Sequence, residues 1–82
     1  MGFKVLSHHY IMGRGFVTVI SNPELIPIDT NCFIIQDDEK IPIIGVEKLM
    51  TLMTIPTPKP NWGIVTNKEI FGEIIEICGK NF

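Results

Sequence analysis

The sequence contains no alanine, and it has little of what metal, redox or nucleic-acid sites require. Because alanine is the best helix former, its absence disfavours an all-helical fold. The two cysteines, Cys32 and Cys78, do not form a C-x-x-C pair, so neither a zinc site nor a redox motif is expected. The seven basic residues are scattered along a chain of net charge −2, which predicts no strong nonspecific binding of nucleic acid.

Long apolar runs are also missing. None approaches the roughly 20 residues that a membrane-spanning helix needs, so no membrane association is expected. The N-terminal residues lack the apolar stretch of a secretory signal peptide. The expected location is therefore the cytoplasm.

The chain is short, apolar and rich in isoleucine. Its 82 residues predict a single small domain over 1–82, while 45% of them are hydrophobic and only 20% are charged. Isoleucine is β-branched and suits pleated sheet, and the 7 glycines and 6 prolines supply many chain breaks. These features predict a mostly β fold. They also suggest that surplus apolar surface is covered by self-association or by a permanent partner.

Two hairpins are expected from the dense apolar segments. Residues 3–12 and 16–20 flank a glycine-rich break at 13–15, which predicts a turn or bulge. Residues 32–46 read as a second hairpin whose polar tip lies at 37–40. Pro42 cannot donate to a strand ladder, so its position must face an edge or a bulge.

The C-terminal half is less uniform. Val46, Leu49, Met50 and Met53 have helical spacing and predict one short helix, and the proline-rich segment at 55–60 predicts a rigid connector. Residues 66–79 leave two alternatives open. Thr66 and Glu69 match a helix capping box, whereas the isoleucines at 74–77 favour a strand.

Several glycine steps in this sequence resemble those of a known family. They read G-R-G-F-V-T-V-I at 13–20, I-P-I-D-T-N-C-F-I at 26–34, I-G-V-E at 44–47, N-W-G-I-V at 61–65 and F-G-E-I-I at 71–75. In order and spacing they resemble the second domain of translational GTPases of the elongation factor Tu kind, over residues 3–77. The chain departs from that pattern at Asp29, Thr30 and Phe71, which stand where the family has glycine, an acid and arginine.

The resemblance implies a small antiparallel β-barrel. In the family this barrel contacts ribosomal RNA or the aminoacyl end of tRNA, so a protein or RNA partner is expected here. The GTPase chemistry belongs to another domain of those proteins, and this chain has no G-x-x-x-x-G-K-[ST] loop for phosphates. Neither a cofactor nor GTP hydrolysis is expected.

Residues capable of catalysis or metal binding are few. His8 and His9 are neighbours and would point to opposite faces of a strand, so they cannot chelate one metal ion. A nucleophilic cysteine would need one of them as its base, and a buried, inert cysteine is the simpler interpretation. The acidic residues at 37–39 fit a solvated hairpin tip. The sequence therefore predicts no catalytic residue and no metal site.

Arg14 and Trp62 are the two candidate binding residues. Arg14 lies between glycines, where a ligand can approach the backbone, and its guanidinium can grip a phosphate or carboxylate. Trp62 follows the proline-rich segment and can stack on a base or anchor a protein contact. The sequence thus predicts a non-enzymatic binding module with an unknown partner. The alternative is a structural protein that forms homo-oligomers through an apolar interface.

Overall fold

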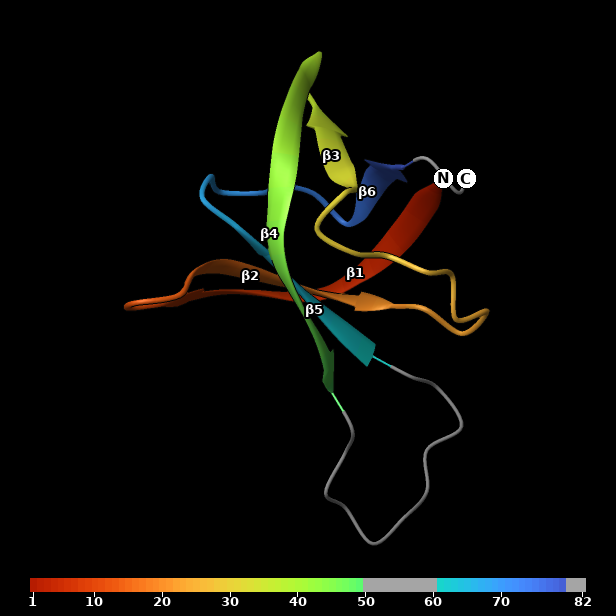
Figure 1. Cartoon of the computed structure of the whole chain (residues 1–82), viewed down its shortest axis with the longest axis horizontal. Helices are drawn as coiled ribbons and strands as arrows, with labels where there is room; N and C mark the ends of the chain where they lie inside the picture. The colour runs from red at the N-terminus through yellow and green to blue at the C-terminus, as the bar shows by residue number, and fades with distance from the viewer. Residues whose placement is uncertain (50–60, 80–82) are drawn as a thin grey trace, which may run out of the picture.

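Six antiparallel strands form a closed barrel in the computed structural model, which describes residues 1–49 and 61–79 (Figure 1). The strands are β1 (Gly2–Ile11), β2 (Gly15–Ser21), β3 (Phe33–Gln36), β4 (Glu39–Leu49), β5 (Asn61–Thr66) and β6 (Ile74–Cys78). Around the barrel their order is β1-β2-β5-β4-β3-β6. The predicted mostly β fold, a small antiparallel barrel, is confirmed. No helix of the described residues is long and apolar enough to cross a membrane.

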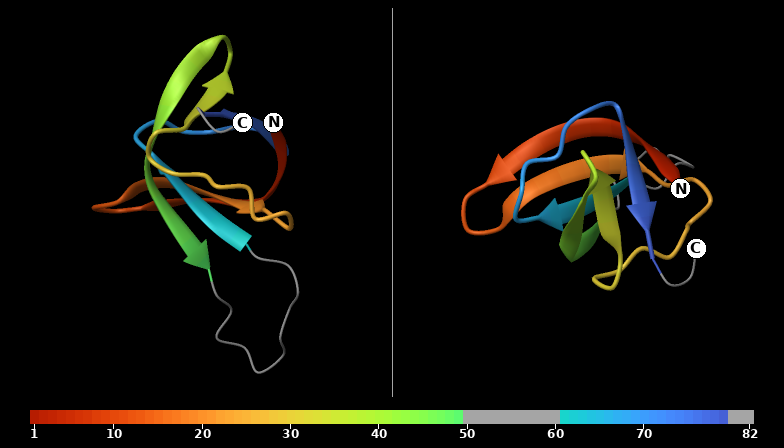
Figure 2. Two further views of the ribbon diagram at one scale, coloured as in Figure 1. Left: turned by 45° about the vertical axis from the view of Figure 1, so that its right-hand side comes forward. Right: turned by 90° about the horizontal axis from the view of Figure 1, so that it is seen from above.

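The two longest strands each take part in two layers of the barrel. The first residues of β1 pair with β6 and its later residues with β2, with a register shift between Val5 and Ser7. In the same way β4 pairs first with β3 and then with β5, with a shift between Ile43 and Gly45. Bulges increase local twist and bend a strand, so each shift marks a corner of the barrel. Figure 2 shows β1 curving along the barrel wall between the layers.

Isoleucines fill the interior. Ile20, Ile34, Ile43, Ile64 and Ile77 come from five different strands and are at most 1% exposed. In strands the side chains alternate between faces, so these isoleucines share the inner face, while β5, which lies between β2 and β4, is buried over Trp62 to Thr66. Phe3 and Trp62 complete the interior from β1 and β5.

Both predicted hairpins are present. The β1–β2 turn contains Gly13 and Gly15 at φ +86° and +114°, and the Arg14 amide donates to the Ile11 carbonyl. The β3–β4 hairpin turns at Asp37 and Asp38, whose φ values of +51° and +63° correspond to the two-residue I′ turn typical of twisted hairpins. Pro42 lies beside the bulge of β4, in the part that pairs only with β3, as predicted.

The predicted short helix near residue 46 is wrong. Val46 and Leu49 belong to β4 and pair with Ile64 and Asn61 of β5. Pairing with a neighbouring strand therefore outweighs the helical spacing of the apolar residues. Met50, Met53 and the proline-rich segment at 55–60 lie outside the described residues.

Of the two alternatives for residues 66–79, the strand is correct. The Thr66 hydroxyl donates to the Lys68 carbonyl at 2.7 Å, so it makes a local turn in place of a helix cap. Gly72 has φ +95°, which a right-handed helix does not allow. After it, β6 pairs with β1 on one side and with β3 on the other.

Candidate functional site

The tip of the β1–β2 hairpin extends beyond the barrel, where β1 has left its pairing with β6 (Figure 1). The β5–β6 loop, residues 67–73, lies along this extension. Its backbone is attached to β1 twice: Val5 N donates to the Glu73 carbonyl at 2.7 Å, and His8 Nε2 lies 3.0 Å from the Gly72 carbonyl. The loop and the hairpin are therefore held together as one surface.

A cavity of about 220 Å³ lies between this loop and the hairpin. Its aromatic wall is formed by Tyr10 and Phe16, which are opposite each other across the two strands. Their ring centroids are 4.9 Å apart at an interplanar angle of 61°, an edge-to-face arrangement that is favourable for aromatic pairs. His8, Thr18, Glu69 and Ile70 complete most of the lining.

The His8 ring has a defined tautomer. A carbonyl oxygen can only accept hydrogen bonds, so the bond to Gly72 requires that Nε2 of His8 carries a proton. In the neutral imidazole Nδ1 then has no proton and acts as an acceptor. His9 also lines the cavity, and its Nε2 lies 2.8 Å from the Ser7 hydroxyl. The two imidazoles therefore have different hydrogen-bond partners.

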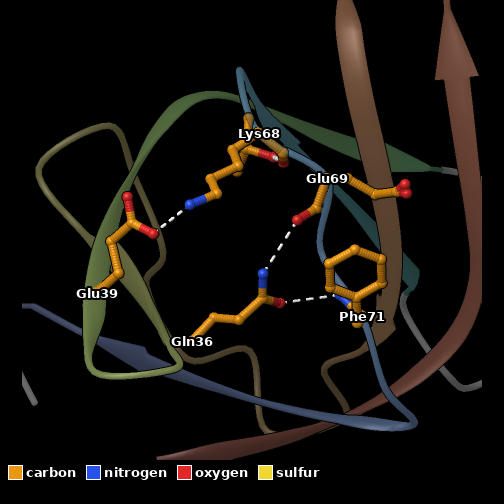
Figure 3. A network of polar contacts seen from close by, with 6 residues as sticks. Gln36, Glu39, Lys68, Glu69 and Phe71 are labelled. Carbon is orange, nitrogen blue, oxygen red and sulfur yellow. Dashed lines mark hydrogen bonds and ion pairs between the residues drawn. The ribbon is translucent and has the colours of Figure 1, made fainter.

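The position of Glu69 is set by a glutamine on β3. The Gln36 amide donates to the Glu69 carbonyl at 3.0 Å and accepts from the Phe71 amide at 2.9 Å (Figure 3). The Glu69 side chain points away from Gln36, toward the β1–β2 hairpin (Figure 3). Lys68 points the other way and forms an ion pair with Glu39 at the start of β4 (Figure 3). The loop thus turns a carboxylate toward the cavity and a lysine away from it.

Exposed apolar side chains lie along β1 and the segment attached to it, and one of them, Tyr10, lines the cavity. Tyr10 is 64% exposed, Phe71 60% and Ile74 73%, and Leu6 is also exposed. Leu6 and Tyr10 belong to β1, Phe71 lies in the attached loop, and Ile74 pairs with Lys4, so these four residues follow most of the length of β1. We call them the β1 patch. Single exposed apolar residues are ordinary, but a group of them along one strand is typical of an interaction surface.

The structure does not bring the two predicted binding residues together. Arg14 is exposed in the β1–β2 turn and pairs with Glu47 of β4, so the ion pair bridges across β5. Trp62 lies near the opposite end of β5, where it pairs with Ile20, and it is 5% exposed within the core. The two residues therefore do not lie on one surface, and a binding role for either of them stays a prediction.

The remaining candidate residues are also dispersed. Cys32 is buried in the core and Cys78 is half-buried on β6, and neither lines the cavity that contains His8. The acidic residues at 37–39 are exposed at the β3–β4 tip, as expected for a solvated turn. Within residues 1–49 and 61–79 no group of three or more histidine, cysteine or acidic side chains is placed to hold a metal ion.

The residues of the cavity were not singled out from the sequence. The pairing of Tyr10 with Phe16 was not accessible either, because the strands pair symmetrically about Gly13 whereas the predicted break at 13–15 is centred on Arg14. Glu69 and Ile70 carried no signal. They reach the cavity only because the loop folds back onto β1, more than fifty residues earlier in the chain.

A second cavity of about 370 Å³ lies at the other end of the β1–β2 pair, between residues 1–4 and 21–26. It has no aromatic pair in its lining, and two of its polar groups already have partners within the chain. The Asn22 side chain bonds both the amide and the carbonyl of Ile26 at 3.0 Å, and the N-terminal ammonium pairs with Glu76. We therefore regard the cavity at His8 and Glu69 as the better candidate site. Comparisons with protein-family models, curated proteins and solved structures found no match to this chain.

Proposed function

We propose that this chain is a non-enzymatic binding module that docks a segment of a partner protein on the β1 patch and the adjoining cavity. One observation carries the proposal. Two chain segments that are distant in sequence are hydrogen-bonded so that three apolar side chains are exposed along β1: Tyr10, which lines the cavity, and Phe71 and Ile74 on the attached segment. Aromatic side chains in such a setting are the usual anchors of protein interfaces.

The charge distribution favours a protein partner over RNA. Arg14 and Lys68 are each paired with a glutamate, and the Lys40 ammonium lies 5.0 Å from the centre of the Phe33 ring. The cavity itself contributes a carboxylate and no lysine or arginine. A groove for single-stranded RNA normally combines aromatic rings with basic side chains along the backbone path.

The proposal that the module is not an enzyme is supported by the separation of its reactive groups. A cysteine nucleophile would need an imidazole within hydrogen-bond reach. Cys32 lies in the core and Cys78 on β6, whereas His8 is bonded to the β5–β6 loop in the cavity. The likeness to the elongation factor Tu barrel stays a prediction, because six antiparallel strands around a core are common to many proteins.

The experiment is affinity capture from cell extract, followed by measurement of direct binding between the purified partner and matched variants. We expect Phe71→Ser to weaken binding of the partner about tenfold, because the substitution removes an anchoring aromatic residue. Leu25→Ser is the control, because Leu25 is as exposed as Phe71 but lies in the β2–β3 loop. Equal binding by both variants contradicts the proposal, and loss of the partner after nuclease treatment identifies RNA instead.

Self-association is the second candidate function. Over residues 7–11, β1 pairs only with β2, so one edge of this strand lacks a strand partner within the described chain. An unpaired strand edge of this kind can pair with the same edge of a second copy. Light scattering over a range of concentrations tests it: the self-associating chain is dimeric, and Ile11→Lys returns it to a monomer. A wild-type monomer at every concentration contradicts this function.

A further inference from the structure

The cavity beneath the β1–β2 hairpin contains two groups that can accept a hydrogen bond from a ligand, one on His8 and one on Glu69. The His8 ring uses its Nε2 proton for the Gly72 carbonyl, which leaves Nδ1 of the neutral ring as an acceptor. The Glu69 carboxylate accepts only, and Figure 3 shows it turned toward the hairpin. A ligand group that donates N–H protons fits this pair of acceptors, and the hydroxyls of Tyr10 and Thr18 in the same lining can accept as well as donate.

The walls of the same cavity are apolar and aromatic. Tyr10 and Phe16 provide two rings at 4.9 Å, and Ile70 is buried beside them. Aromatic faces attract cations through the ring quadrupole, and they also cover an aliphatic chain. The volume of 220 Å³ is about seven times the roughly 30 Å³ that one water occupies in the liquid. This leaves room for a cationic head together with a short alkyl stem.

The chain does not neutralise the carboxylate with its own nearest lysine. Lys68, the residue before Glu69, forms its ion pair with Glu39 of β4. The hydrogen bonds between the Gln36 side chain and the loop backbone fix the loop so that Lys68 and Glu69 point to opposite sides of it (Figure 3). The negative charge at the cavity is therefore available to a cation from outside.

We propose that this cavity binds an alkylammonium group, with the ammonium at Glu69 and His8 Nδ1 and the alkyl stem against Tyr10, Phe16 and Ile70. The inference rests on the proposed function, because it names what a partner inserts at the same site. A lysine side chain of a partner protein and a free alkylamine share this chemistry. We expect that neither a neutral alcohol nor a carboxylate binds in the cavity in place of the ammonium.

The test is a titration of the isotope-labelled protein with n-butylammonium chloride, followed by the amide signals of Tyr10, Phe16 and Ile70. We expect saturable shifts at these amides and about tenfold weaker binding by Glu69→Gln, which keeps the shape and removes the charge. Glu73→Gln is the matched control, because Glu73 is an exposed carboxylate of the same loop that does not line the cavity. Its affinity should equal that of the wild type.

Three results overturn the inference. They are equal binding of n-butanol and n-butylammonium, equal affinity of Glu69→Gln and Glu73→Gln, and shifts that fall elsewhere on the barrel. The amide spectra of both variants also show that each remains folded. Added salt should weaken the butylammonium complex and leave any butanol complex unchanged.

Two further measurements are needed. One shows whether the ammonium belongs to a lysine side chain or to a free amine, and the other shows whether a negative result refutes only the ammonium site or the whole binding module. N-acetyl-lysine methylamide should bind more tightly than n-butylammonium if the site is built for a lysine side chain, and equally if it takes a free amine. With the captured partner, loss of binding in Phe71→Ser but not in Glu69→Gln refutes the ammonium and preserves the module. Unchanged binding in both variants refutes the module itself.

Discussion

Alanine at Gly15 should destabilise the barrel much more than alanine at Gly13, although the two glycines occupy the same turn. Both have positive φ, +86° at Gly13 and +114° at Gly15. A Cβ at Gly13 would meet nothing within 4 Å, whereas a Cβ at Gly15 would lie 2.8 Å from the Thr66 carbonyl oxygen. The pair of substitutions therefore separates the backbone conformation from the close approach of β2 to β5.

The magnitudes follow from these two contributions. An L-residue held at positive φ costs roughly 1–2 kcal/mol, which applies to Gly13→Ala and Gly15→Ala alike. At Gly15 the clash with Thr66 also has to be relieved by a backbone shift, which adds about 1–3 kcal/mol. Thr66 cannot yield easily, because it pairs with Phe16 on one side and with Ile43 on the other. We expect totals of about 1.5 kcal/mol and about 3.5 kcal/mol.

Urea unfolding followed by tryptophan fluorescence measures the difference. Trp62 is the single tryptophan of the chain and lies in the core, so its emission reports the loss of the barrel. With a slope of about 1 kcal/mol per molar urea for so short a chain, the midpoints should fall by about 1.5 M and 3.5 M. If Gly15→Ala lacks a native baseline, both variants are compared with trimethylamine oxide present. Equal loss of stability in the two variants would refute the argument from the Thr66 contact.

Three further substitutions test the barrel away from this turn. Asn22→Ala should lower the free energy of unfolding in urea by about 2 kcal/mol, because it leaves the amide and carbonyl of Ile26 without their 3.0 Å partners. A loss of less than about 1 kcal/mol would count against the role assigned to this side chain. Replacing Asp37 and Asp38 by Asn-Gly should raise stability by about 0.5–1 kcal/mol and therefore the melting temperature, since both positions have positive φ; a lower melting temperature would contradict the I′ turn. Ile64→Val should cost about 1 kcal/mol, since Ile64 is fully buried, and a neutral result would mean that the core closes around the missing methyl group.

The strands and turns were predictable where local chemistry and tertiary structure agree. The glycines around Arg14 and the acidic pair at 37–38 occupy turns whose backbone suits them, so both hairpins could be read from the chain. At residues 66–79 the two disagreed. The helical spacing of Ile70 and Ile74 suggested one buried face, yet Ile70 is buried and Ile74 is exposed. The period of two around Ile75 and Ile77 describes the burial of β6 correctly.

The candidate site was much less accessible from the sequence. Trp62 attracted attention as a large aromatic residue after prolines, but its position two residues before Ile64 turns it into the core. The cavity combines side chains from the β1–β2 hairpin with Glu69 and Ile70 of the β5–β6 loop. Its formation depends on the hydrogen bond between His8 and Gly72 and on the position of Gln36, which are contacts between segments far apart in the chain.

Because of the corners at Val5–Ser7 and Ile43–Gly45, β1 and β4 each belong to both layers of the barrel. Neither layer can come apart while the other stays intact, because two of its strands continue into its neighbour. The β1–β2 hairpin belongs to this unit as well, because β2 pairs with β5 from Phe16 to Ser21 and His8 is bonded to the β5–β6 loop. Opening the cavity would therefore require breaking contacts on both strands of the hairpin.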